Sequence, residues 1–276
     1  LNRPEMQAIA QQVATAWTDQ TVNSDEALQR LATVLQTPEG RAVLNQTLET
    51  NPQQVSEWLN RLLTSEQTPA NTAALTRFLT LPAVQKSVPQ FLEQASPETA
   101  SRLLTTLADK APTPVAQTIL QDPAFQTQIP RLLNQSDTAS PLLRLLARPD
   151  LQEESSRALQ VQAPQTAQTL AKILTQDIPR TEINGTQSSS PQSRTETDSA
   201  PSQQIPSQTQ TAQMTRATLE LLARPELASL ARQVLSNTEA RQAILRQLDT
   251  PQTAEPVLAA LSRPESAPLA RLVFNP

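Results

Sequence analysis

The carboxylates of this 276-residue chain leave a route to acid–base catalysis open. The chain has no histidine and no cysteine, so a serine–histidine–aspartate triad, a cysteine nucleophile and the usual zinc sites are excluded. Its two glycines, Gly40 and Gly185, are too few for a glycine-rich phosphate loop. Paired acids remain, as in a glycan-processing enzyme that holds two carboxylates about 5 to 10 Å apart in a cleft.

Two pairs of adjacent acids are the candidates for that chemistry, Asp25–Glu26 and Glu153–Glu154. Neighbouring side chains on a helix point about 100° apart, so we interpret both pairs as solvated helix caps and faces. The prediction is therefore a protein that is not an enzyme, with no catalytic residue, no bound metal and no cofactor. A carboxylate-dependent glycan-processing enzyme is kept as an alternative.

The composition favours an all-α protein. Aromatic residues make up 2% of the chain, tyrosine is absent and glycine occurs twice, so the residues that strands and tight turns use are scarce. A net charge of -4 gives no basic surface for nucleic acid. No apolar stretch approaches the roughly 18 residues that span a bilayer. We expect a soluble protein, cytoplasmic or secreted; because it begins at Leu1 rather than Met, we interpret it as a processed or excised piece.

A proline recurs six times in the same apolar setting. A leucine stands three residues before each of these anchor prolines, and a leucine or phenylalanine stands ten residues after it. The anchors are Pro38, Pro82, Pro123, Pro149, Pro225 and Pro264. Since proline ends one helix and fits the first turn of the next, each anchor predicts a corner between two helices. Pro89 and Pro130, seven residues after an anchor, are expected to kink or split their helices.

The spacing of the anchors indicates the repeating unit. Successive anchors lie 44, 41, 26, 76 and 39 residues apart, and the value near 41 defines a full unit. Such a unit has room for three short helices, which we expect over 82–95, 96–108 and 113–121. The 26-residue interval, from Pro123 to Pro149, has room for two.

The 76-residue interval contains a segment rich in Gln, Ser, Thr and Pro, residues 181–211, which we expect to be disordered. Removing it with its short flanks, about 35 residues, returns the interval to about 41. We therefore interpret it as an insertion between the second and third helices of one repeat. Residues 1–180 are then the N-terminal part of a helical-repeat solenoid, with helices over 4–19 and 24–36, and residues 212–276 are the C-terminal part of the same solenoid.

Units of about 40 residues built from two or three helices resemble those of armadillo and HEAT-type helical repeat proteins. The resemblance covers nearly all of the chain outside the insertion. It implies an all-α solenoid of mostly three-helix units, in which each unit is stabilised by packing on its neighbours. It also implies a protein or peptide partner held along an extended surface.

Three arginines and two tryptophans are the candidate residues for partner binding. Arg148, Arg224 and Arg263 each stand directly before an anchor proline, so they could form a ladder facing acidic side chains of a partner. The alternative is that each cation complements the dipole at a helix C-terminus. Trp17 is expected to be an exposed anchor for a partner. Trp58 is predicted to be buried, because Val55 and Leu62 share its helix face.

These observations together predict a non-catalytic helical-repeat scaffold that mediates protein–protein interaction. The bias toward Gln, Thr, Ser and Pro and the predicted insertion suggest a second possibility. That alternative is a secreted or translocated bacterial effector, or a component of an export apparatus.

Overall fold

The fold is known from a computed structural model that describes residues 31–65, 68–176, 208–249, 254, 258, 262 and 267–274. Within these residues every regular element is a helix and no strand occurs, which confirms the all-α prediction for this part of the chain. None of the helices described combines the length and the apolar character needed to cross a membrane.

The helices are short and follow one another closely along the chain. Their bounds are α3 Pro38–Thr50, α4 Pro52–Thr64, α5 Pro69–Leu79, α6 Pro82–Gln94, α7 Pro97–Asp109, α8 Thr113–Gln121, α9 Pro123–Leu133, α10 Ser136–Ala147, η1 Pro149–Leu151, α11 Gln152–Val161, α12 Ala163–Gln176, α13 Gln208–Leu222, η2 Pro225–Leu227, α14 Ala228–Ser236, α15 Thr238–Asp249 and α17 Ala267–Phe274. The helices predicted over 82–95, 96–108 and 113–121 are thus confirmed within one residue as α6, α7 and α8. Of the helices predicted over 4–19 and 24–36, only residues 31–36 are described, and 31–34 are helical.

The corner prediction is confirmed at the five described anchor prolines. Pro38, Pro82 and Pro123 occupy the first position of an α-helix, where the missing N–H has no partner to lose. Pro149 and Pro225 each begin a single 3-10 turn that leads into the next α-helix. Pro264 lies outside the described residues.

Hydroxyl and carboxylate side chains cap several of these helices. The oxygen of each capping side chain accepts a hydrogen bond from a backbone N–H of the first turn, which has no helical acceptor. The capping pairs are Thr37 with Gly40, Thr68 with Asn71, Ser96 with Thr99, and Asp122 with Ala124. The helix starts are therefore defined locally, by a cap residue and the proline that follows it.

Gly40, in the first turn of α3, lies against the end of the preceding helix. A Cβ atom at this position would clash with the Val34 carbonyl oxygen and with Thr37 Oγ1. Because the Val34 oxygen belongs to the backbone, the clash can be relieved only by a shift of the main chain. We expect Gly40→Ala to lower the free energy of unfolding by about 1 to 3 kcal/mol, measured by urea denaturation. The matched control is Gln46→Ala at an exposed position of the same helix, with an expected change within about 0.5 kcal/mol.

The interior prolines do not split their helices, so that part of the prediction is wrong. Helix α6 continues through Pro89, and helix α9 continues through Pro130. An interior proline removes one backbone hydrogen bond, but both rings are buried in the core and gain apolar contacts there. In addition, the Pro89 carbonyl oxygen accepts a hydrogen bond from Gln128 Nε2 at 2.9 Å.

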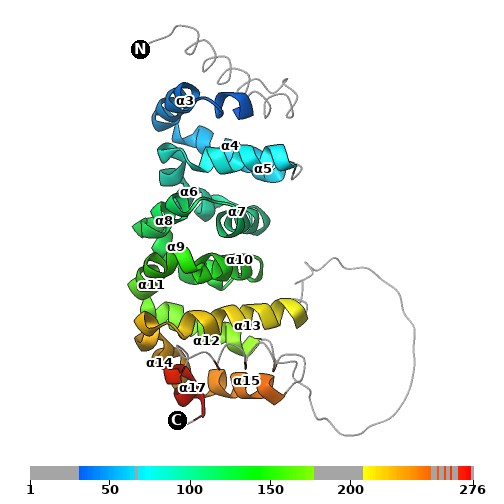
Figure 1. Cartoon of the computed structure of the whole chain (residues 1–276), viewed down its shortest axis with the longest axis vertical. Helices are drawn as coiled ribbons and strands as arrows, with labels where there is room; N and C mark the ends of the chain where they lie inside the picture. Colours follow the sequence, from blue (N-terminus) through cyan, green and yellow to red (C-terminus); the bar gives the residue numbers. More distant parts are fainter. Residues whose placement is uncertain are drawn as a thin grey trace, which may run out of the picture.

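The helices are stacked in layers along the longest axis of the molecule, from α3 at one end to α15 and α17 at the other (Figure 1). Successive members of three sets pack on one another. The first set is α3, α6, α9, α12 and α15; the second is α4, α7, α10 and α13; the third includes α8, η1 with α11, and η2 with α14. The layers that contain α6, α9 and α12 therefore each contribute one helix to every set.

This packing separates anchors that the sequence treated as equivalent. Pro123 begins α9, which packs on α6, whereas Pro149 begins η1, which packs on α8. The two prolines therefore start helices of different sets, and the 26-residue interval between them is not a shortened layer. Both kinds of corner use the same residue types, so a proline alignment cannot tell them apart.

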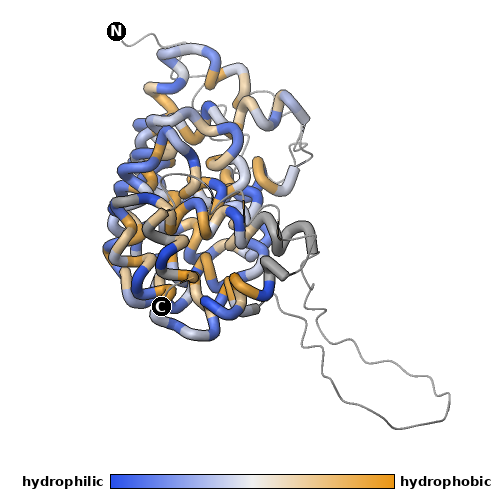
Figure 2. The backbone as a smooth tube through the Cα atoms, turned by 60° about the horizontal axis from the view of Figure 1, so that its bottom comes forward, coloured by the Kyte–Doolittle hydropathy of each residue, from blue (hydrophilic) through white to orange (hydrophobic). Residues whose placement is uncertain are grey.

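A single apolar core runs through the described layers. Apolar and polar stretches alternate along the backbone (Figure 2), as expected for helices with one buried face. At the five described anchors, the leucines three residues before and ten residues after the proline are buried: Leu35, Leu79, Leu120, Leu146, Leu222, Leu48, Leu92, Leu133, Leu159 and Leu235. Phe274, the counterpart at the last anchor, is 56% exposed.

The predicted insertion begins and ends near two neighbouring helices. Helix α12 ends at Gln176 and helix α13 begins at Gln208, so residues 208–211 are helical, contrary to the boundary expected from the sequence. These residues are all polar, and the apolar side chains that anchor α13, such as Leu219 and Leu222, come later in the helix. Residues 181–207 of the insertion lie outside the described part of the chain.

Candidate functional site

Arg148, the first of the predicted binding arginines, is the C-cap of α10 and reaches toward the preceding layer. Its Nη1 donates to the carbonyl oxygens of Leu107, at 2.9 Å, and Ala111, at 3.1 Å. These carbonyls lie in the last turn of α7 and just beyond it, where helical donors are missing. The contacts match the alternative of a cation at a helix C-terminus, but the helix is α7 of the preceding layer and not α10 itself.

The remaining nitrogens of Arg148 hold Asp150. Nε donates to Asp150 Oδ1 at 3.1 Å, and Nη2 donates to Oδ2 at 2.6 Å. The Thr113 hydroxyl, at the start of α8, also donates to Oδ2. The hydrogen bonds from Arg148 and Thr113 lower the pKa of Asp150 from 3.8 to about 2. The side chain of Arg148 is 17% exposed, so most of its bonding capacity is directed into its own chain.

The depressed pKa of Asp150 predicts a pH dependence of stability. Well above pH 3.8, from about pH 5, the carboxylate is ionised in the folded and unfolded chain alike, and its bonds stabilise the fold fully. As the pH falls toward 2, the unfolded chain binds the proton first and this stabilisation is lost. Because the Asp150 side chain is 37% exposed, solvent screening limits the effect to about 1 kcal/mol.

The measurement is urea unfolding of the wild type and of Asp150→Asn between pH 6 and pH 2. The difference between their free energies of unfolding should be constant above about pH 5 and should shrink below pH 4. A difference that stays constant down to pH 2 would show that Asp150 is not held by Arg148 and Thr113.

Arg224, the second predicted arginine, precedes η2 as Arg148 precedes η1. It is half-buried, and its Nη1 is buried without a hydrogen-bond partner. Burial lowers the pKa of Arg224, and the charges of Glu226 and Glu220 partly offset this. Arg224 therefore lacks the carbonyl contacts that Arg148 makes. Arg263 and Trp17, the other two predicted binding residues, lie outside the described residues.

The remaining sequence candidates are placed on the surface or in the core. Trp58 is buried, as predicted, and its ring stacks on Phe78 with 5.7 Å between the ring centroids. Glu153 forms an exposed ion pair with Arg157 one turn later in α11. Asp25 and Glu26 lie outside the described residues. No group of three or more acidic side chains that could hold a metal ion occurs in the described residues.

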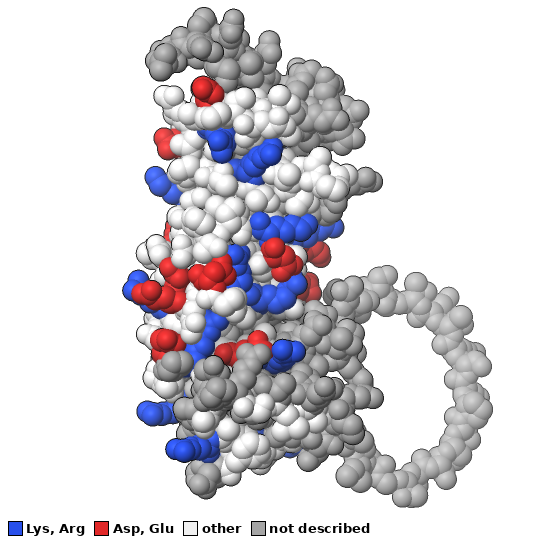
Figure 3. Space-filling model, viewed as in Figure 1, with Lys and Arg blue, Asp and Glu red and all other residues white. Residues whose placement is uncertain are grey.

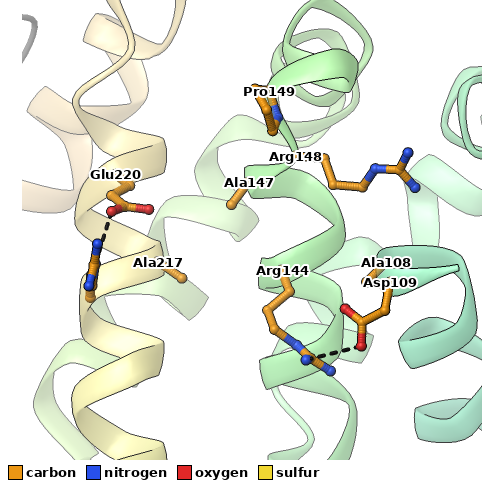
Figure 4. A pocket seen from close by; sticks show the side chains of 9 residues that line it. Ala108, Asp109, Arg144, Ala147, Arg148, Pro149, Ala217 and Glu220 are labelled. Carbon is orange, nitrogen blue, oxygen red and sulfur yellow. Dashed lines mark hydrogen bonds and ion pairs between the residues drawn. The ribbon is translucent and has the colours of Figure 1, made fainter. Parts of the chain in front are cut away.

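A groove that the sequence did not reveal lies where α7, α10 and α13 meet. Its volume is about 380 Å³. Ala147 and Ala217 face each other across the space between α10 and α13 (Figure 4). The full lining is Ala108, Asp109, Arg144, Ala147, Arg148, Pro149, Arg216, Ala217 and Glu220. The groove is thus lined by small apolar side chains between the helices and by charged side chains along its edges.

Two ion pairs border this groove. Arg144 Nη1 of α10 lies 3.2 Å from Asp109 Oδ2 of α7, and Arg216 Nε of α13 lies 3.0 Å from Glu220 Oε1 one turn later. The groove therefore brings two carboxylates, Asp109 and Glu220, to one surface. Each contacts its own arginine, so neither is a free acid or nucleophile. The arrangement is better suited to binding a charged group than to cleaving a bond.

The groove could not be found from the sequence because residues 148–207, which include η1, α11 and α12, separate α13 from α10 along the chain. Only the packing of α13 on α10 brings Arg216 close to Arg144. No protein-family model, no curated protein and no solved structure matches the chain. The function must therefore be argued from the layers and the groove alone.

Proposed function

We propose that this chain is a non-catalytic helical-repeat solenoid that acts as a scaffold and binds another protein along its stacked layers. The proposed unit has about 40 residues and three helices, as in the repeat families that the sequence resembles. One unit is α6, α7 and α8; the next is α9, α10 and η1 with α11; the third is α12, α13 and η2 with α14.

The observation that carries this proposal is the narrow range of sequence separations, 35 to 41 residues with one exception, between described residues that bond from layer to layer. Seven such pairs are separated by 37 to 41 residues: Asn45–Ala83, Leu63–Arg102, Pro89–Gln128, Leu92–Arg131, Leu107–Arg148, Thr113–Asp150 and Asn134–Lys172. The pairs occur in all three sets of helices. A fixed separation of this kind is expected where one unit is stacked on the next.

The bond between Gln160 of α11 and the Glu226 carbonyl of η2 is the exception, with 66 residues between its partners. The chain between them includes residues 177–207, which connect α12 to α13. The longer separation therefore supports the interpretation of this segment as an insertion into one unit. With the units divided as proposed above, residues 177–207 follow α12, the first helix of the third unit.

Stacked units create an extended surface, and binding along such a surface is the use that the structure supports best. The described groove contains no unpaired carboxylate for acid–base chemistry. Its alanines and arginines instead offer contact area and charge to a partner. Scaffold function is therefore favoured over the glycan-processing alternative.

The test is capture of partners by the immobilised full-length chain from an extract of its source, followed by cross-linking and mass spectrometry. We expect a partner in stoichiometric amount whose cross-links reach at least two neighbouring layers among α7, α10 and α13. Hydrolysis of a glycan that is lost in Asp109→Asn or Glu220→Gln would instead overturn the proposal in favour of an enzyme.

A further inference from the structure

We propose that the exposed face of α7, α10 and α13, with the groove between them, binds an extended acidic segment of a partner protein. This inference rests on the scaffold function proposed above and names the surface and the chemistry of its partner. It replaces the ladder expected at Arg148, Arg224 and Arg263 with a different set of arginines.

An exposed arginine recurs on successive helices of the second set. Arg61 lies on α4, Arg102 on α7, Arg144 on α10 and Arg216 on α13, and all four are exposed. The space-filling view shows basic side chains in successive layers, with acidic side chains beside them over the middle layers (Figure 3). The positive charges thus follow the stacking direction of the helices.

The separation of the layers fits an extended chain. Packed helices lie about 8 to 10 Å apart, and an extended peptide advances about 3.3 Å per residue. A carboxylate at every third residue would therefore recur about every 10 Å and meet one arginine in each layer. A helical ligand would need a different spacing, because it advances about 1.5 Å per residue.

The groove gives such a peptide a place to lie. Ala108, Ala147 and Ala217 leave the space of about 380 Å³ between the helices, so a backbone can approach closely there. Arg216 uses Nε for Glu220, and Arg144 uses one terminal nitrogen for Asp109. A guanidinium has further N–H donors, which can donate hydrogen bonds to a second carboxylate, from the partner.

The exposure of the paired charges in the groove favours an acidic partner over a basic one. Arg144 and Arg216 each pair with one lining acid, while the third lining arginine, Arg148, is held by Asp150. Within the pair on α13, the Arg216 side chain is 49% exposed and that of Glu220 is 24% exposed. The positive member of this pair is therefore the one more available to a ligand.

The experiment measures binding of fluorescent synthetic peptides to the full-length chain by fluorescence anisotropy. The probe is a peptide of five Glu-Ser-Thr repeats. The comparison peptides replace Glu by Lys or by Gln in every repeat, or use Glu-Ser-Ser-Thr repeats, in which the carboxylates are further apart. We expect the Glu-Ser-Thr peptide to bind at least about tenfold more tightly than the Lys and Gln analogues. The wider repeat should bind less tightly, and added salt should weaken the binding.

Single charge reversals locate the surface. Arg144→Glu and Arg216→Glu should each weaken the Glu-Ser-Thr peptide about tenfold. Arg157→Glu is the matched control. Like Arg216, Arg157 forms an exposed ion pair with an acid one turn away on the same helix, but this helix is α11 and Arg157 does not line the groove. Ala217→Leu narrows the groove without changing its charge and should also weaken binding. Thermal unfolding of each variant checks that the fold is intact.

Equal binding of the Lys and Glu peptides, or equal loss of affinity in Arg157→Glu and Arg144→Glu, would overturn the proposed surface. A protein captured from the extract that still binds both Arg144→Glu and Arg216→Glu would also overturn it, while the scaffold function would stand. The scaffold function itself would be overturned by a different result: no protein would be captured from the extract, although the Glu-Ser-Thr peptide binds through Arg144 and Arg216.

Discussion

Replacing Phe125 by alanine is expected to lower the free energy of unfolding by about 3 to 5 kcal/mol. Phe125 of α9 is fully buried, and α9 packs on α6, α8, α10, α11 and α12. The substitution leaves a cavity in the core beside α9, and neighbours held by other contacts can close it only in part. The loss should therefore exceed the apolar transfer free energy of the ring alone.

Urea denaturation followed by far-ultraviolet circular dichroism measures this effect. The control is Thr127→Ala two residues later in α9, where the side chain is exposed, with an expected change within about 0.5 kcal/mol. Because a layer is stabilised by its neighbours, Phe125→Ala should also broaden or divide the unfolding transition. A loss of less than about 1 kcal/mol would show that α9 does not tie the adjoining layers together.

Replacing Arg148 by methionine is expected to cost about 2 to 4 kcal/mol, the second largest effect. Methionine keeps much of the apolar stem but removes every donor. The Leu107 and Ala111 carbonyls then lose a charged partner, and the Asp150 carboxylate loses its counter-ion. Arg148→Lys should recover only part of the loss, because an ammonium group cannot reach all of these oxygens in the geometry of a guanidinium.

The control for Arg148→Met is Arg157→Met. Arg157 also pairs with an acid, but its side chain is 69% exposed, so its removal should cost less than about 1 kcal/mol. A double-mutant cycle of Arg148→Met with Asp150→Asn isolates the coupling between the two side chains. If Arg148→Met costs no more than Arg157→Met, the bonds from Arg148 to α7 do not stabilise the stack.

The parts of the fold that depend on short-range rules could be predicted from the sequence. A proline fixes the start of a helix, and leucines at fixed distances from it face the core, which is why the corners at Pro38, Pro82 and Pro123 were found together with buried Leu79 and Leu120. Trp58 was placed in the core by the same helical spacing. These features need no knowledge of which helices pack together.

The parts that depend on packing between layers could not be predicted. The sequence gives Pro123 and Pro149 the same local pattern, and only the contacts of α9 with α6 and of η1 with α8 show that they differ. Likewise, nothing near Arg148 in sequence indicates that it bonds to Leu107, 41 residues earlier. The groove required both the packing of α13 on α10 and the side-chain positions of Arg144 and Arg216.

The bonds between layers also bear on how the chain reaches its fold. Apart from Gln160–Glu226, the described side-chain bonds between layers join residues no more than 41 apart. Contacts of such limited sequence separation require little loop closure, which favours rapid folding from any layer. Each interior layer is held from two sides, so local opening should begin at the ends, and the amides of α7 to α11 should exchange their hydrogens with solvent most slowly.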